Sequence, residues 1–129
     1  MALFFNFVMN RIFLGSKKWQ PGLQKQQPGL QNENWKIAIC SDVHEHLQNL
    51  ERMLEICKQE KVQTILCAGD LISPILARRF VKAGIPLILV KGNNDGEVLG
   101  LANALQKPHQ FYIENYEGVI GGRRIFMKH

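Results

Sequence analysis

Three short apolar runs follow one another after residue 35, and each one leads into a stretch with helical spacing. The runs cover residues 36–40, 62–68 and 85–90, and their β-branched content predicts buried strands. Between them, apolar residues recur at positions 47, 50, 53, 54 and 57, which predicts an amphipathic helix over 47–60. The pattern therefore alternates strand and helix.

Two further helices are expected. Ser73 and Pro74 have the chemistry of a helix cap and first turn, and Gly84 that of a helix end. We expect this helix to face the core with Ile75, Leu76, Phe80 and Val81. A third, shorter helix is predicted over 97–105.

The alternation of apolar strands with helices predicts a parallel sheet with right-handed crossovers, so the expected fold class is α/β. The sequence from residue 110 onward has a different pattern of apolar and polar residues. This pattern predicts antiparallel strands over 110–113, 118–120 and 123–127, with Gly121 and Gly122 as a hairpin turn.

Residues 1–34 differ from the rest of the chain. Residues 1–15 are largely apolar, but this run is too short to span a bilayer and lacks the flanks of a signal peptide. Residues 20–24, Gln-Pro-Gly-Leu-Gln, recur as 27–31, and each Pro-Gly pair excludes a continuous helix. We predict an amino-terminal extension and flexible low-complexity linker over 1–34, before a domain over 35–129. The alternative is upstream DNA translated from too early a start codon.

Composition narrows the function classes. With 46% hydrophobic residues the chain can build a core, and its net charge of +5 comes mostly from scattered basic pairs. These pairs lack interleaved aromatics, which argues against a nucleic-acid surface and agrees with a small anionic substrate. The three cysteines, Cys40, Cys57 and Cys67, lie among apolar neighbours without a CxxC motif, which predicts free buried thiols and a reducing cytoplasm.

Polar residues cluster where predicted strands end. Asp42 and His44 follow the first strand, Asp70 follows the second, Asn93 follows the third, and His129 ends the last. Carboxyl ends of strands are where open α/β sheets bind ligands. Because the side chains of residues i and i+2 of an extended chain point the same way, Asp42 and His44 are expected to bind one metal ion together. Asp70 is expected to bridge this ion and a second one.

Each residue also has a structural explanation when it is taken alone. Asp42 could cap the helix that follows, His44 could face solvent, and Asp70 and the Gly-Asn-Asn-Asp string at 92–95 could be turn chemistry. Five such residues at consecutive strand ends favour the metal site. Gly69 and Gly92 are expected to permit the sharp turns that bring the ligands over the strand ends.

Three blocks, Ser41-Asp42-Val43-His44, Gly69-Asp70 and Gly92-Asn93-Asn94-Asp95, resemble in their order the calcineurin-like metallophosphoesterases. The closer likeness is to small bacterial and archaeal phosphodiesterases of the YfcE type. The resemblance covers residues 36–129 and implies a sandwich of βαβ units and mixed sheets flanked by helices. It also implies a dinuclear metal site formed by Asp42, His44, Asp70, Asn93 and His129.

The chain departs from the family in three places. The last family block, Gly-His-x-His, is absent, so the domain is expected to lack its carboxyl-terminal part. Asn94 stands where many relatives have a histidine that acts on the leaving group, so no general acid is assigned. Glu45 and His46 replace a frequent Gly-Asn pair, and His46 is expected to open the helix rather than reach the phosphate.

The resemblance implies a cytoplasmic, divalent-metal-dependent phosphodiesterase that hydrolyses a small phosphoester through a metal-bridging hydroxide. It implies two ions, Mn²⁺ first, with Zn²⁺, Fe²⁺, Ni²⁺ and Mg²⁺ as alternatives. No nucleic-acid or membrane partner is expected, and a homo-oligomer is compatible with the sequence. The competing hypothesis is a catalytically impaired relative that acts as a protein-interaction scaffold or is a non-functional fragment.

Overall fold

A four-stranded parallel sheet forms the centre of the molecule. The structure is a computed structural model that describes residues 35–129 except Glu45. Its strands are adjacent in chain order, β1-β2-β3-β4, and all pairs are parallel. The remaining two strands form a separate antiparallel hairpin, β5-β6. In chain order the elements are β1 (Ile37–Cys40), α1 (Leu47–Gln59), β2 (Thr64–Cys67), α2 (Pro74–Ala83), β3 (Leu87–Val90), α3 (Val98–Ala104), β4 (Gln110–Tyr112), β5 (Tyr116–Ile120) and β6 (Arg123–Met127).

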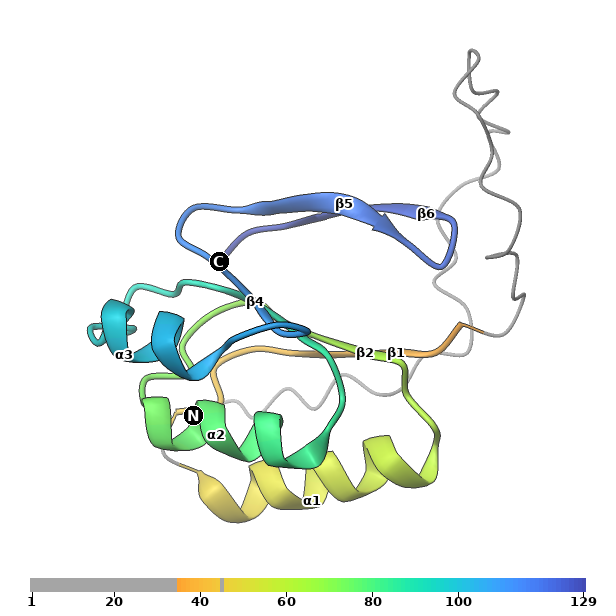
Figure 1. The fold of residues 1–129 in the computed structure, drawn as a ribbon, viewed down its shortest axis with the longest axis horizontal. Helices are drawn as coiled ribbons and strands as arrows, with labels where there is room; N and C mark the ends of the chain where they lie inside the picture. The colour runs from red at the N-terminus through yellow and green to blue at the C-terminus, as the bar shows by residue number, and fades with distance from the viewer. Residues whose placement is uncertain (1–34, 45) are drawn as a thin grey trace.

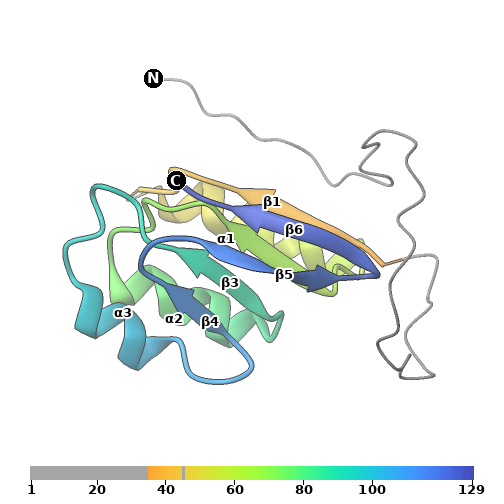
Figure 2. The same ribbon diagram turned by 90° about the horizontal axis from the view of Figure 1, so that it is seen from above.

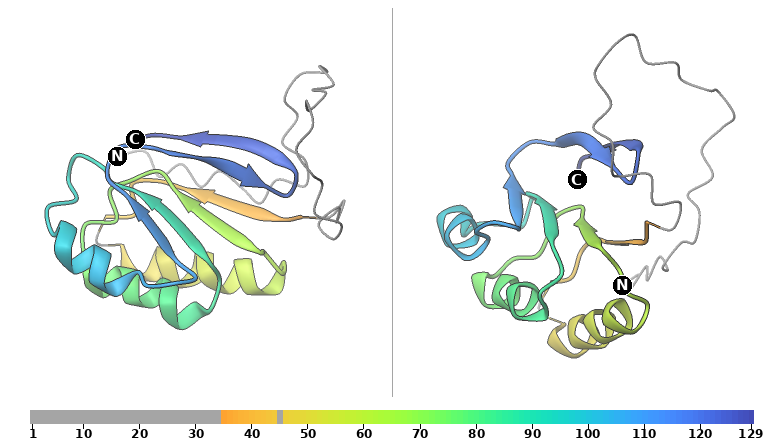
Figure 3. Two further views of the ribbon diagram at one scale, coloured as in Figure 1. Left: turned by 45° about the horizontal axis from the view of Figure 1, so that its top comes forward. Right: turned by 45° about the vertical axis from the view of Figure 1, so that its right-hand side comes forward.

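Each strand of the sheet lies next to the one before it in the sequence, always on the same side, and this order determines which face the helices cover. Right-handed crossovers between successive parallel strands place every connecting helix on the same face. Figure 1 shows α1 and α2 beneath the sheet, with α3 beside α2, while the hairpin β5-β6 lies over the opposite face. Seen from above in Figure 2, the hairpin lies in front of the sheet with α1 and α2 behind it, and Figure 3 shows the same order of layers. The predicted α/β sandwich is confirmed.

Both faces of the sheet are packed, and this explains the unbroken apolar runs of its central strands. All residues of β2 and β3 are buried. On the helix side they pack with Leu50 and Leu54 of α1 and Phe80 of α2, and on the hairpin side with Tyr116 and Met127. Strands buried on two faces lose the polar alternation of a half-exposed sheet.

The helix boundaries follow the predicted capping residues. Ser73 caps α2 by accepting a hydrogen bond from the backbone N–H of Ile75, at 3.1 Å from its Oγ, and Pro74 occupies the first turn. Gly84 ends the helix in the left-handed conformation, with φ of 74°. The N-cap residue of α1 is His46, as expected, although its side chain makes no capping hydrogen bond.

The prediction of which residues of α2 face the core is partly wrong. Leu76 and Phe80 are buried as expected, but Ile75 and Val81 are 65% and 40% exposed, and Ala77 is buried in their place. Positions 76, 77 and 80 form one stripe at i, i+1 and i+4, whereas 75 and 81 flank it. The prediction relied on the larger side chains and so overlooked the contribution of the small Ala77 to the buried face.

The tail is only partly antiparallel. The segment predicted over 110–113 pairs in parallel with β3, with Ile88 opposite Gln110 and Val90 opposite Tyr112. This strand has three residues and lies at the sheet edge, so it lacks the apolar run that identifies a buried parallel strand. The hairpin itself is confirmed, although β5 begins at Tyr116 rather than 118. Gly121 and Gly122 have φ of 56° and 76°, as a type I′ turn requires.

The prediction for residues 1–34 lies outside the described residues, and the proposed division at residue 35 stays a prediction. Within 35–129, no helix is long and apolar enough to cross a membrane. Cys57 and Cys67 are buried and Cys40 is half-buried, and all three thiols are free.

Replacing Phe80 with alanine tests the observed face of α2. The fully buried ring should leave a cavity, and the free energy of unfolding should fall by about 3–5 kcal/mol. Val81→Ala is the matched control in the same helix and should change it by about 0.5 kcal/mol or less, because that side chain is half-exposed. Urea denaturation measures both, and equal losses in the two variants would contradict the assignment.

His109 should make the fold sensitive to acid. Its ring is buried, its Nδ1 accepts the Leu87 backbone N–H at 3.2 Å, and burial lowers its pKa. The unfolded imidazole titrates near 6.5, so its contribution to stability is present above about pH 6.5 and is lost as the pH falls through the lower folded value. His109→Asn keeps an acceptor but cannot titrate. Urea unfolding between pH 7.5 and 5 should show a smaller loss of stability for this variant than for the wild type.

The exposed His46 provides the control for this measurement. His46→Asn should keep the pH dependence of the wild type. An identical pH dependence in wild type and His109→Asn would show that the buried imidazole does not contribute.

Candidate metal centre

The loops that follow β1 and β2 are joined by backbone hydrogen bonds. The N–H of Ala68 donates to the carbonyl of Cys40 at 2.9 Å, which extends the strand pairing by one step. Beyond it, the N–H of Asp42 donates to Gly69 at 3.1 Å and that of His44 donates to Asp70 at 3.0 Å. The three predicted ligands on these loops are therefore held side by side by the main chain.

Asp42 and His44 converge, but not for the predicted reason. Both have left-handed backbone, with φ of 54° and 47°, so neither lies in an extended strand and the alternation argument does not apply. The His44 Nε2 lies 3.7 Å from Asp42 Oδ1. Non-glycine residues rarely adopt this conformation, and such residues concentrate at functional sites.

Asp70 lies between two imidazoles. Its Oδ2 is 3.7 Å from His44 Nε2, and its Oδ1 is 3.8 Å from His129 Nε2. The side chain of Asp70 is only 2% exposed, whereas that of Asp42 is 55% exposed. The carboxylate thus presents one oxygen to each histidine from the floor of the site.

The Asp70 carboxyl is kept ionised by its surroundings. Burial raises its pKa, but the backbone and side-chain N–H groups of Asn94, with the imidazoles of His129 and His44, lower it more. The Asn94 backbone N–H donates to Oδ1 at 2.9 Å and its side-chain amide donates to Oδ2 at 2.7 Å. The pKa therefore lies below its ordinary value, and the group is a carboxylate at neutral pH.

Asn93 and His129 are 36 residues apart in the sequence but lie next to each other in the structure. The His129 Nδ1 is 2.6 Å from the carbonyl oxygen of Ala68, and its Nε2 is 2.7 Å from Asn93 Oδ1. A carbonyl can only accept, so Nδ1 carries the proton, and in the neutral ring Nε2 has a free lone pair. A histidine whose other nitrogen donates to a backbone carbonyl is the usual arrangement of a metal ligand.

The donor set fits divalent metal ions. Ligand atoms of Asp42, His44 and Asp70 all lie within 4.8 Å of one another. Carboxylate oxygens with imidazole nitrogens suit ions such as Mn²⁺, Fe²⁺ and Zn²⁺. The structure brings together all five residues that the sequence singled out, in two pairs on either side of Asp70.

Two residues of the site were missed as contributors. Asn94 anchors the Asp70 carboxylate, and the carboxylate of Asp95 accepts the backbone N–H groups of Asp70 and Gly92 at 3.0 and 2.7 Å. Asp95 is only 1% exposed. The sequence did contain a sign of both residues. Asn94 and Asp95 directly follow the predicted ligand Asn93, and two further polar side chains beside one ligand suggest additional roles at the site.

The two predicted glycines are required for close approach. Gly69 has φ of 94°, and a Cβ there would lie 2.5 Å from His129 Nδ1. Gly92 does not have a positive φ, so the turn argument is wrong for it. Its Cβ would instead collide with the carboxylate and backbone of Asp70.

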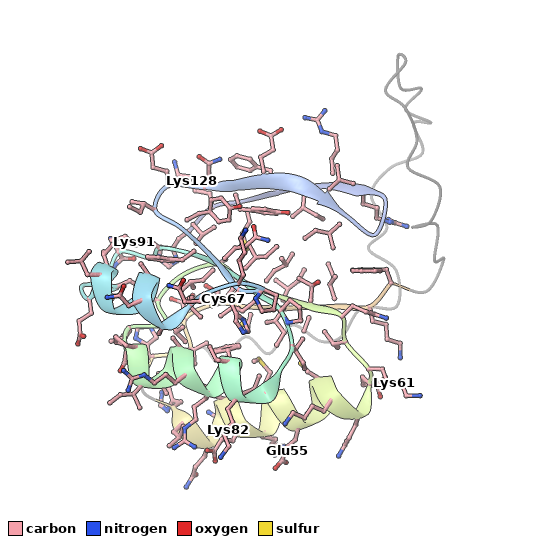
Figure 4. The ribbon with its side chains drawn as sticks, in the orientation of Figure 1. Glu55, Lys61, Cys67, Lys82, Lys91 and Lys128 are labelled. Atoms are coloured by element: carbon pink, nitrogen blue, oxygen red, sulfur yellow. The ribbon has the colours of Figure 1, made fainter. Side chains whose placement is uncertain are left out.

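The remaining candidate residues are Glu45, His109 and the cysteines. Glu45 is outside the described residues, and His109 is buried beside β3. Burial raises the pKa of the Cys57 thiol to about 11, and contact with Cys40 and burial raise that of Cys67, so both stay protonated. Figure 4 shows Cys67 in the interior, and Lys91 and Lys128 at the same side of the molecule.

Comparison with known proteins indicates the family. Residues 35–129 match the family described as the calcineurin-like phosphoesterase superfamily domain. Phosphodiesterase MJ0936 of Methanocaldococcus jannaschii is 40% identical over 62 residues, which cover 48% of this chain and 37% of that protein. The solved structure of an archaeal phosphodiesterase matches with a TM-score of 0.68 and 30% identity, over 72% of this chain and 58% of that one.

A second solved structure, of Yfce, a phosphoesterase from E. coli, shares the fold. Its TM-score is 0.59 at 23% identity, and the match covers 72% of this chain and 56% of that one. The matched regions thus span between about one third and three fifths of these relatives. Since the family match covers the whole described region, the chain belongs to the calcineurin-like phosphoesterase superfamily.

Proposed function

We propose that the protein is a divalent-metal-dependent phosphodiesterase with a two-ion centre. One observation carries the proposal: the buried Asp70 carboxylate presents Oδ2 to His44 and Oδ1 to His129, at 3.7 and 3.8 Å. Each imidazole is paired with a further oxygen ligand, from Asp42 and Asn93 respectively. A carboxylate flanked by two such pairs is suited to bridge two cations.

The relatives support the reaction class. MJ0936 is named a phosphodiesterase, the archaeal protein of known structure is described as a phosphodiesterase, and Yfce as a phosphoesterase. The chain spans only part of each, so its own activity is a proposal. The five candidate ligands favour the enzyme over the scaffold alternative, because a protein-interaction scaffold does not require five converging metal-binding side chains.

Divalent ions held here would supply Lewis-acid stabilisation of a phosphoryl oxygen and activation of water. Asp42 and His44 would hold one ion, Asn93 and His129 the other, with Asp70 shared. Asn94 keeps the Asp70 carboxylate oriented through two hydrogen bonds. An amide has no transferable proton, so Asn94 cannot protonate a leaving group, and its role is positional.

The mixed oxygen and nitrogen donors are compatible with Mn²⁺, the ion proposed first, and with Zn²⁺, Fe²⁺, Ni²⁺ and Mg²⁺ as alternatives. We propose a small phosphoester as the substrate, and the partly exposed side chains of Asp42, His44 and His129 are open to it from solvent. Free thiols fit a reducing compartment, which supports a cytoplasmic location.

Asp70→Asn tests the proposal most sharply among single substitutions. The variant keeps the shape of the side chain but loses the charge and one ligand oxygen. Manganese-dependent hydrolysis of bis(p-nitrophenyl) phosphate should fall by at least about 100-fold, beyond the usual cost of an outer-shell change. Activity of the wild type should vanish with EDTA and return with excess Mn²⁺.

Glu55→Gln is the matched control, because Glu55 is exposed on α1 in the helix layer (Figure 4). It makes the same carboxylate-to-amide change and should leave hydrolysis within about twofold. Full manganese-dependent activity in Asp70→Asn would overturn the proposal.

A further inference from the structure

A second buried aspartate lies directly behind the proposed ligands. The Asp95 carboxylate is 1% exposed, and its Oδ2 accepts the backbone N–H groups of Asp70 and Gly92 at 3.0 and 2.7 Å. Its Oδ1 accepts the N–H of Ile72. Both oxygens are therefore occupied by main-chain donors from two different loops.

These hydrogen bonds stabilise the buried charge of Asp95. Within the described part of the chain, no ion pair involves Asp95. A buried carboxylate without a counter-charge is costly unless hydrogen bonds replace its hydration. Three backbone donors provide that replacement, and charge-assisted bonds of this type are stronger than neutral ones.

The loop after β2 and the loop after β3 each donate hydrogen bonds to an aspartate of the other loop. Asp70, after β2, accepts hydrogen bonds from Asn94, and Asp95, after β3, accepts hydrogen bonds from Asp70 and Ile72. Asp70 and Ile72 have left-handed backbone, with φ of 55° and 73°. This conformation is unfavourable, above all for a β-branched residue, and persists only where surrounding contacts hold it. The bonds to Asp95 are such contacts.

We propose that Asp95 is a positioning residue of the metal centre, a role that rests on the proposed function. By holding the N–H of Asp70 and the N–H of Gly92, it sets the direction of the bridging carboxylate and the distance of Asn93 from it. Asp95 does not touch the ions or the substrate. It acts through the main chain of the residues that do.

Asp95→Asn is a nearly isosteric test. Both carboxylate oxygens of Asp95 accept backbone N–H groups. In either orientation, the side-chain NH₂ group of the asparagine would therefore face at least one backbone N–H group, and that hydrogen bond would be lost. Manganese affinity, measured by calorimetry on the folded metal-free protein, should weaken by about 10- to 100-fold. A merely structural role would lower the thermal midpoint and leave the affinity of the folded fraction unchanged.

Glu97→Gln is the matched control, since Glu97 is an exposed carboxylate two residues further along. It removes the same charge from the same region, so an equal loss of affinity in both variants would assign the effect to long-range electrostatics and overturn the positioning role. Wild-type affinity in folded Asp95→Asn would overturn it as well.

Amide hydrogen exchange separates this inference from the proposed function. In the metal-free wild type, the amides of Asp70, Ile72 and Gly92 should be protected at least about tenfold relative to exposed loop amides. This result is expected even if the protein binds no manganese and hydrolyses nothing, which would refute only the function. Unprotected exchange at these three amides in the wild type would refute the role of Asp95, whether or not Asp95→Asn folds.

Discussion

The exchange of backbone donors between two loops is the constraint on which the site depends. Asp70 accepts N–H groups from the loop after β3, and Asp95 accepts N–H groups from the loop after β2. Each aspartate thereby compensates its own burial and fixes the loop of the other. Hydrogen bonds from Asp42 and His44 to Gly69 and Asp70 attach the loop after β1 to the same unit. These hydrogen bonds fix the orientation of the candidate ligands, and ligands held by such partners bind metal ions more tightly.

The winding direction of the sheet brings the last candidate ligand to the site. Helices occupy one face because all crossovers have the same hand, and this leaves the other face for β5-β6 (Figure 1). The hairpin packs on that face through Tyr116 and Met127 and returns the chain to the carboxyl ends of the strands. His129, two residues beyond β6, can then contact Ala68 and Asn93. A residue remote in sequence thus joins the site through a hydrophobic contact between layers.

Sequence reasoning located the elements and the five donors because both depend on local patterns. Central strands buried on two faces are visible as apolar runs, and Ser73, Pro74 and Gly84 mark helix ends by their own chemistry. Parallel pairing of β4 was missed because a three-residue edge strand has no such run. The left-handed backbone of Asp42 and His44 could not be predicted from their spacing, since it results from hydrogen bonds to a loop more than twenty residues away. Asp95 was overlooked for the same reason: its partners are main-chain groups, which have no sequence signature.

The central claim is that Asp70 lies between two cation sites. A crystal of the protein equilibrated with Mn²⁺ tests it most directly, with data collected on both sides of the manganese absorption edge. The account predicts two anomalous peaks that flank the Asp70 carboxylate, one beside Asp42 and His44 and the other beside Asn93 and His129. A single peak, or peaks that do not contact Asp70, would contradict it.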